Sequence, residues 1–171
     1  MQNYFDCFQK VKKKCYSFIS SQETKREKFK NKEKMVKSFL IPICFWIFKN
    51  KPKNKTFIIG LAGGQGTGKT TISSLIRLIL STYFKLNVFK VSIDDFYKTR
   101  KERLKLSKSK HPLLLTRGVP GTHDVDMLNK LFRNVKNSKF KSMLIPKFDK
   151  SIDDRCNKKL WYKLKKKPDV L

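Results

Sequence analysis

Acidic residues are scarce in this 171-residue chain, which has 13 Asp and Glu against 41 Lys and Arg and a formal net charge of +28. Such an excess attracts nucleic acid or an anionic membrane surface. The lysines are scattered along the whole chain, however, as an A/T-rich coding sequence would also produce. No zinc finger, helix-turn-helix or RNA-binding aromatic motif accompanies them. The sequence therefore predicts no dedicated nucleic-acid partner.

Cysteine motifs and long apolar runs are missing too. The cysteines form no C-x-x-C pair and no metal-ligand spacing with a histidine, and they predict reduced thiols in a cytoplasmic protein: Cys7, Cys15, Cys44 and Cys156. No apolar segment with a small-residue cleavage site indicates a signal peptide. The apolar run 39–48 is interrupted by Pro42 and has about half the length that crosses a bilayer. It predicts a packed helix and no membrane span.

The length of the chain suits one domain with added N-terminal helices. Residues 1–37 are basic and predict a helical or flexible extension, whose first half places Phe5, Phe8 and Cys15 on one helical face. Residues 38–55 predict a docking helix and a linker, and residues 56–171 predict the first part of the main domain.

A glycine-rich loop is the strongest motif in the sequence. Residues 63–70 match G-x-x-x-x-G-K-[ST] in full: Gly63, Gly64, Gln65, Gly66, Thr67, Gly68, Lys69 and Thr70. An apolar, β-branched run precedes the loop and a helical pattern follows it, which is the context of a phosphate-binding loop. We expect Lys69 to reach the β- and γ-phosphates of a nucleotide and the Thr70 hydroxyl to bind Mg²⁺. The alternative is a strand-to-helix turn that binds nothing.

A second strand is predicted at residues 88–93, directly before Asp94 and Asp95. The order strand, loop, helix, strand predicts a parallel pair with a right-handed crossover. Ligands of such sheets lie beyond the carboxyl ends of the strands, so both acids are expected at the edge that carries the glycine-rich loop. Acids there hold Mg²⁺-bound water or accept a proton from a hydroxyl. Asp95 has an alternative role as the cap of the next helix.

Further along the chain, residues 98–110 predict a lysine-rich helix and residues 117–124 a turn-rich loop. A helix is predicted from about Val125 to Val135, with Asp124 as its N-cap.

Several blocks together resemble the D-glycerate 3-kinase family, a branch of the P-loop kinases related to uridine kinase, pantothenate kinase and phosphoribulokinase. The matching residues are 63–71, 92–97, 111–113, 117–124, 146–150 and 153–155. The blocks S-I-D-D-F-Y and R-G-V-P-G-T-H-D are the most specific, and the resemblance covers about residues 56–160. It implies an α/β fold of the P-loop NTPase type, with a parallel sheet flanked by helices.

The resemblance also implies a function. Such kinases use ATP and Mg²⁺ to phosphorylate a hydroxyl of a small molecule, here most simply D-glycerate. Thr71 joins the nucleotide-binding residues, and Lys69 and Asp94 take the catalytic positions. The implied acceptor-side residues are Asp95, Tyr97, Arg117, His123, Asp124, Lys150 and Arg155. His123 could equally be structural within its loop, and the two arginines could equally be surface charges.

Residues 167–171 correspond to the beginning of the family's next core strand. The expectation is therefore a domain truncated before its third core strand, from a split gene or a longer polypeptide, or completed by a separate C-terminal half. Alternative functions stay open. They are a uridine- or pantothenate-type metabolite kinase, an ATP-binding fragment without catalysis, and a basic protein that binds polyanions.

Overall fold

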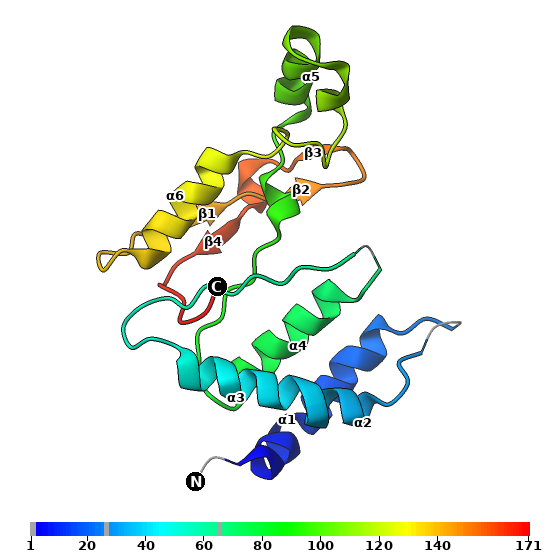
Figure 1. The fold of residues 1–171 in the computed structure, drawn as a ribbon, viewed down its shortest axis with the longest axis vertical. Coiled ribbons are helices and arrows are strands. Elements are labelled where there is room, and N and C mark those ends of the chain that lie inside the picture. Colours follow the sequence, from blue (N-terminus) through cyan, green and yellow to red (C-terminus); the bar gives the residue numbers. More distant parts are fainter. Residues whose placement is uncertain (1–2, 26–27, 65) are drawn as a thin grey trace. The chain divides into compact units, whose positions relative to one another are not determined.

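The structure is a computed structural model that describes residues 3–25, 28–64 and 66–171. The chain divides into two compact units, and Figure 1 labels their helices and strands. Unit 1 comprises Met1–Lys90 together with Pro168–Leu171, and unit 2 comprises Val91–Lys167. Each unit is described by itself below.

The helices of unit 1 are α1 (Tyr4–Gln22), α2 (Lys32–Lys34), the π-helix η1 (Met35–Leu40), α3 (Ile41–Asn50) and α4 (Lys69–Thr82). Helix α1 begins at a capping residue, because the side-chain oxygen of Asn3 accepts a hydrogen bond from the Asp6 N–H at 2.6 Å. The wider turns of η1 lie directly before Pro42, whose ring and missing N–H disfavour α-helical bonding to the preceding turn.

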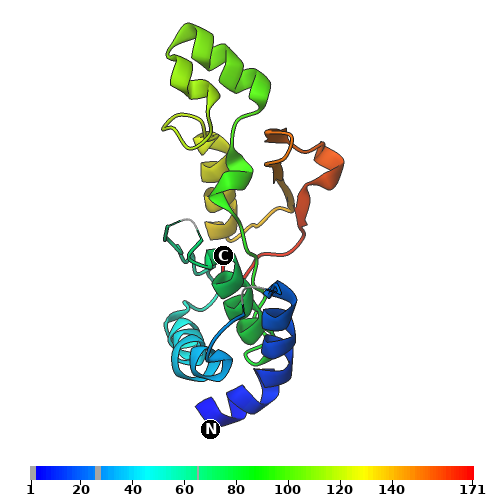
Figure 2. The ribbon, with the colours of Figure 1, turned by 90° about the vertical axis from the view of Figure 1, so that its right-hand side faces the viewer.

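Apolar side chains of α1, α3 and α4 form the core of unit 1, and the three helices lie side by side in Figures 1 and 2. In α1 the buried residues follow helical spacing: Cys7, Phe8, Val11, Cys15 and Ile19. Helix α4 contributes Leu75, Ile79 and Leu80. The prediction that Phe5 shares this face is wrong, since Phe5 is 66% exposed in the first turn of α1, at the edge of the apolar stripe.

The predicted strands at 56–62 and 88–93 are extended segments that pair only at single positions. Phe57 and Val88 each form a parallel bridge with Val170, which therefore lies between the two segments. The Phe57 N–H donates to the Asp169 carbonyl at 2.9 Å, and the Phe89 N–H donates to the Val170 carbonyl at 3.0 Å. The predicted parallel pair of these two segments does not form, because each bridges to Val170, and no continuous parallel sheet forms within the described ranges.

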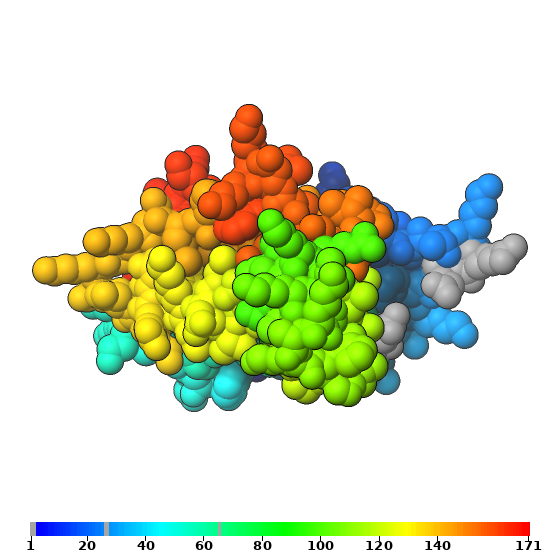
Figure 3. Space-filling model, turned by 90° about the horizontal axis from the view of Figure 1, so that it is seen from above, coloured from blue at the N-terminus to red at the C-terminus, as the bar shows by residue number. Residues whose placement is uncertain are grey.

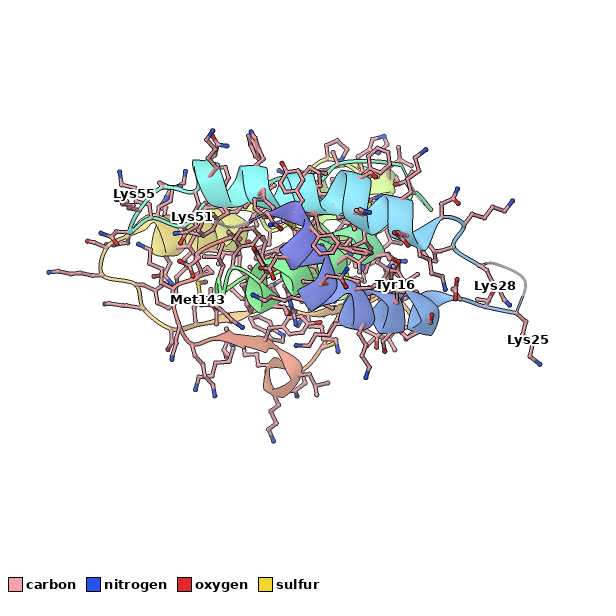
Figure 4. All side chains as sticks on the ribbon, turned by 90° about the horizontal axis from the view of Figure 1, so that it is seen from below. Tyr16, Lys25, Lys28, Lys51, Lys55 and Met143 are labelled. Carbon is pink, nitrogen blue, oxygen red and sulfur yellow. The ribbon has the colours of Figure 1, made fainter. Side chains whose placement is uncertain are left out.

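Lysine side chains cover the surface of unit 1. Lys25 and Lys28 extend away from the helices in Figure 4, and Lys55 is exposed as well. Lys51 forms an ion pair with Asp169 at 3.3 Å. Among the helices of the described residues, none is both long and apolar enough to cross a membrane.

Unit 2 contains α5 (Arg100–Ser109), α6 (Val125–Lys136), and the 3₁₀ helices η2 (Ile93–Phe96), η3 (Pro112–Leu115) and η4 (Lys158–Leu160). Its strands are β1 (Met143–Ile145), β2 (Phe148–Asp149), β3 (Asp154–Arg155) and β4 (Tyr162–Leu164). Strand β1 pairs antiparallel with β4, placing Met143 opposite Leu164, and β2 pairs antiparallel with β3, placing Phe148 opposite Arg155. Both helices predicted in this region are present, and Figure 3 shows the surface that they form.

Candidate active site

The glycine-rich loop of unit 1 leads directly into α4. Gly66 and Gly68 have φ angles of 78° and 76°, a conformation that side chains other than glycine rarely adopt. Gly68 is the N-cap of α4 and offers no side chain to the N–H groups of the first turn. A loop of this kind presents backbone N–H groups and the positive end of a helix to an anion.

The Lys69 ammonium is held against this loop. Its Nζ atom donates to the Gly63 carbonyl at 2.7 Å and also to the Gly64 carbonyl. The Thr67 hydroxyl donates to the Gly64 carbonyl at 2.9 Å. A Cβ atom at position 63 would lie 3.0 Å from the Thr67 hydroxyl oxygen, a tight contact that glycine avoids. The loop is therefore compact around the one lysine that the motif specifies.

The hydroxyl-bearing residues after the lysine fit a Mg²⁺ site that is completed by phosphate. Thr70 lies exposed in the first turn of α4, and Thr71 is half-buried beside it. No group of three His, Cys, Asp or Glu residues converges on a metal position in the part of the chain that the structure describes. Mg²⁺ commonly binds one or two protein oxygens together with water and substrate phosphates, so the Thr70 hydroxyl suits that role. Gln65 lies outside the described residues.

Asp94 and Lys150 form an ion pair in unit 2. The Lys150 Nζ atom lies 2.6 Å from Asp94 Oδ2, and the two side chains are 64% and 41% exposed. An ion pair this exposed contributes little to folding stability. The structure thus places a carboxylate and an ammonium together at an accessible position.

Asp95 has a different environment from its neighbour. Its Oδ1 atom accepts a hydrogen bond from the Phe148 N–H at 3.1 Å, which ties η2 to β2. Burial raises the pKa of Asp95, while the backbone N–H groups that it accepts from act in the opposite direction. The alternative that Asp95 caps the next helix is wrong, because Thr99 caps α5 through a reciprocal hydrogen-bond pair with Glu102.

Tyr97 and His123 stack face to face, with ring centroids 4.1 Å apart and planes 25° apart. Their backbones form an antiparallel bridge. The His123 Nε2 atom is buried and has no hydrogen-bond partner among the described residues. Burial lowers the pKa of His123, and the nearby charge of Asp94 opposes that shift. His123 thus has one buried polar atom without a partner among the described residues.

Tyr97 also lies close to the charged side chains of Asp94, Lys150 and Arg117. Burial raises the pKa of Tyr97, Asp94 raises it further, and Lys150 and Arg117 oppose the change. A Cβ atom at Gly118, next to Arg117, would lie 3.9 Å from the Tyr97 hydroxyl oxygen. We call Asp94, Tyr97, Arg117, His123 and Lys150 the Tyr97 cluster.

The side chains of Asp124 and Arg155 bind each other and two backbone groups. Asp124 Oδ1 accepts from the Met127 N–H at 3.0 Å and so caps α6, as predicted. Its Oδ2 atom accepts from Arg155 Nη2 at 2.9 Å, and Arg155 Nε donates to the Tyr97 carbonyl at 2.6 Å. Burial by itself raises the pKa of Asp124, but these hydrogen bonds and the Arg155 charge outweigh it and lower the pKa. Arg155 therefore links the Tyr97 backbone to the Asp124 side chain.

Sequence reasoning missed Arg103, a fully buried arginine of α5. Its guanidinium carbon lies 5.8 Å from the Phe148 ring centroid, and the guanidinium carbon of Arg117 lies 5.5 Å from the same centroid. One signal was available, because Arg103 stands among lysines and arginine is the cation better suited to burial. The sequence offered no way to tell which carbonyls it would reach.

The known proteins that this chain resembles are named as kinases. No family model matches the chain. "Uncharacterized kinase mug58" of Schizosaccharomyces pombe is 38% identical over 119 residues, covering 66% of this chain and 43% of the relative. "Probable ATP-dependent kinase TDA10" of Saccharomyces cerevisiae is 36% identical over 121 residues, covering 64% and 41% respectively. Other relatives are named pantothenate kinase and uridine kinase.

Among solved structures, D-glycerate 3-kinase from Cryptococcus neoformans var. grubii is similar to this chain with a TM-score of 0.61 and 26% identity, covering 78% of this chain and 48% of that one. This likeness confirms an α/β fold of the kind that this kinase has. The chain spans less than half the length of each of these relatives.

Proposed function

This chain resembles the D-glycerate 3-kinase family of P-loop kinases, and we propose on that premise that it forms the ATP-binding part of a small-molecule kinase. The reaction is the transfer of the γ-phosphoryl group of ATP to a hydroxyl, with D-glycerate as the favoured acceptor and 3-phosphoglycerate as the product. The observation that carries the proposal is the compact loop around Lys69 at the start of α4, in a chain whose relatives are named as kinases.

On the nucleotide side, the backbone N–H groups of residues 63–71 bind the phosphates. Lys69 leaves its loop carbonyls to neutralise the β- and γ-phosphates, and Thr70 supplies a ligand to Mg²⁺. The bound Mg²⁺ would neutralise charge on the transferring phosphoryl group. Phosphoryl transfer depends mainly on positioning and charge, so these groups supply the larger part of what the reaction needs.

On the acceptor side, the Tyr97 cluster binds the small molecule. Asp94 orients the acceptor hydroxyl and accepts its proton. The cluster combines Arg117 and Lys150 with the His123 Nε2 atom, which has no partner among the residues that the structure describes, and this set suits an acid carrying hydroxyl groups. A carboxylate would pair with Arg117, and His123 would hydrogen-bond a hydroxyl. Asp95, Asp124 and Arg155 act indirectly, since each is engaged in holding the backbone.

Two other functions compete with this one. A kinase for uridine or pantothenate would use the same phosphate loop, and relatives with those names are present. An ATP-binding fragment without turnover would bind the nucleotide through the same loop but would show no acceptor-dependent release. A complementing C-terminal half is a further proposal.

The test is ADP release by the purified chain with Mg²⁺–ATP and either D-glycerate, uridine, pantothenate or no acceptor. We expect release that depends on D-glycerate and falls at least about a hundredfold in Lys69→Ala, because the charge on the phosphates is then uncompensated. Lys53→Ala, at an exposed lysine outside the loop, is the matched control. ATP binding without acceptor-dependent release would support the fragment, and release with another acceptor would replace D-glycerate.

A further inference from the structure

Arg103 anchors a chain of charged contacts in unit 2. Its Nε atom donates to the Lys98 carbonyl at 3.2 Å, and Nη1 donates to the Leu115 carbonyl at 2.6 Å. Its Nη2 atom donates to the Asp153 carbonyl at 2.6 Å. The side chain is fully buried, so three separate backbone segments fix its guanidinium group.

Arg103 also fixes the side chain of Asp153. The same Nη2 atom lies 3.0 Å from Asp153 Oδ2. Asp153 has a φ angle of 55°, a conformation that non-glycine residues adopt at a cost and retain where their surroundings determine it. The backbone and the carboxylate of Asp153 are therefore both held by one buried arginine.

The second oxygen of Asp153 faces Arg117. Arg117 Nε lies 2.9 Å from Asp153 Oδ1, and the contact is an ion pair by distance, because Oδ1 accepts no well-directed hydrogen bond from the described residues. The Phe148 ring supports the Arg117 guanidinium group. Arg117 Nη1 is buried and has no partner in the described part of the chain. The Arg117 guanidinium group is thus held by the Asp153 carboxylate at Nε and by the Phe148 ring. Its Nη1 atom is the donor without a partner in the described part of the chain.

We propose that Asp153, held by Arg103, is a positioning residue that aims Arg117 at the carboxylate of the acceptor. This inference rests on the proposed function. An arginine side chain loses considerable rotational freedom when it binds an anion, and a partner that restricts it beforehand reduces that cost. The planar donor group of arginine also recognises a carboxylate in a defined orientation, so its direction affects affinity as well as its charge.

Asp153→Asn is the test variant, because Asn tolerates positive φ at least as well as Asp but lacks the charge that faces both arginines. Asp126→Asn is the matched control, since Asp126 is exposed in the first turn of α6. Three quantities are measured on the full chain: hydrogen exchange at the Arg117 Nε–H by NMR, the Kd for D-glycerate, and the Kd for Mg²⁺–ATP.

We expect Asp153→Asn to speed exchange at the Arg117 Nε–H and to weaken D-glycerate binding about ten- to a hundredfold, as the loss of a charged contact does. The Kd for Mg²⁺–ATP, which reports on unit 1, stays unchanged, and the fluorescence of Trp161 shows that unit 2 stays folded. Asp126→Asn changes none of the three. Unchanged exchange and unchanged D-glycerate binding in Asp153→Asn would overturn the proposal.

Two possible results call for a separate comparison. If the wild-type chain does not bind D-glycerate, the proposed acceptor is wrong, while exchange at Arg117 still tests the positioning. If Asp153→Asn does not fold, the comparison is made within the wild-type chain between Arg117 and the exposed Arg133. Exchange at Arg117 should then be at least about tenfold slower, as expected of a restrained N–H group. Equal rates would contradict the inference.

Discussion

The two units are stabilised by different kinds of contact. Unit 1 has a core of apolar side chains from α1, α3 and α4, built from residues at helical spacing. Unit 2 has fewer buried apolar residues, and its loops are tied together by Arg103 and Arg155, which donate to backbone carbonyls and carboxylates. Long amphipathic helices satisfy their own backbone groups and need only apolar burial. Short helices and loops leave carbonyls that side chains must satisfy.

The two candidate parts of the active site lie in different units. The glycine-rich loop lies in the unit with the apolar core, directly before α4. The Tyr97 cluster lies in the unit held by polar contacts. Under the proposed function, the phosphate site of backbone N–H groups needs a rigid helix start, whereas the acceptor site needs charged side chains in fixed directions. The polar contacts of unit 2 provide such directions.

The chain has two tryptophans, which allows the units to be followed separately. Trp46 belongs to unit 1 and Trp161 to unit 2. Replacing either one by Phe leaves a single fluorescent reporter for the other unit.

The largest expected effect comes from Ile79→Ala, which opens a cavity at a fully buried position of α4. We expect the free energy of unfolding reported by Trp46 to fall by about 3 kcal/mol, because lost burial and a residual cavity both contribute. Urea unfolding of the Trp161→Phe chain measures it. An equal change at Trp161, in the Trp46→Phe chain, would contradict the division into two differently stabilised units.

Arg103→Met should have a smaller effect, centred on unit 2. Met fills much of the volume but cannot donate to the carbonyls of Leu115 and Asp153. We expect a loss of about 2 kcal/mol at Trp161, the cost of leaving buried acceptors unpaired. The control is Arg133→Met, at an exposed arginine of α6. If both variants behave alike in urea unfolding, the buried arginine is not what holds unit 2.

The smallest effects are expected from moderate changes of pH. Unit 1 should lose stability as the pH rises, and unit 2 as it falls. Burial raises the pKa of Cys7 to about 11 and that of Cys15 to about 12. Their contribution to stability is complete below the unfolded thiol pKa near 9 and is lost as the pH rises through the folded values. Unit 1 should therefore weaken by about 1 kcal/mol at a pH of about 9.

Unit 2 should weaken on the acid side instead. Hydrogen bonds from Thr99 and charge from Arg155 lower the pKa of Glu102 in spite of its burial, and the pKa of Asp124 is lowered as well. Their contribution is present above the unfolded carboxyl pKa near 4 and is lost as the pH falls through the folded values, while the raised pKa of Asp95 partly offsets it. Urea midpoints of the two single-tryptophan chains measure both trends. Loss of stability on the same side in both units would refute the expectation.

The sequence predicted the elements whose signals are local. The glycine motif predicted a loop before a helix, Asp124 predicted a cap, and apolar spacing predicted α6. The predicted direct pairing of the segments at Phe57 and Val88 is wrong, because Val170 lies between them. A pairing between residues more than 80 positions apart leaves no local pattern.

The roles of single charged residues were the least predictable. Arg117, Lys150 and Arg155 look alike in a sequence with a large excess of basic residues. Only the tertiary structure distinguishes Arg155, which is 9% exposed and bound to Asp124, from Lys150, which is mostly exposed beside Asp94. The sequence by itself determined the glycine-rich loop and the helix that follows it, because backbone conformation and helix capping are local effects. The tertiary structure decided which charges are buried, paired or left over, because that depends on segments that only folding brings together.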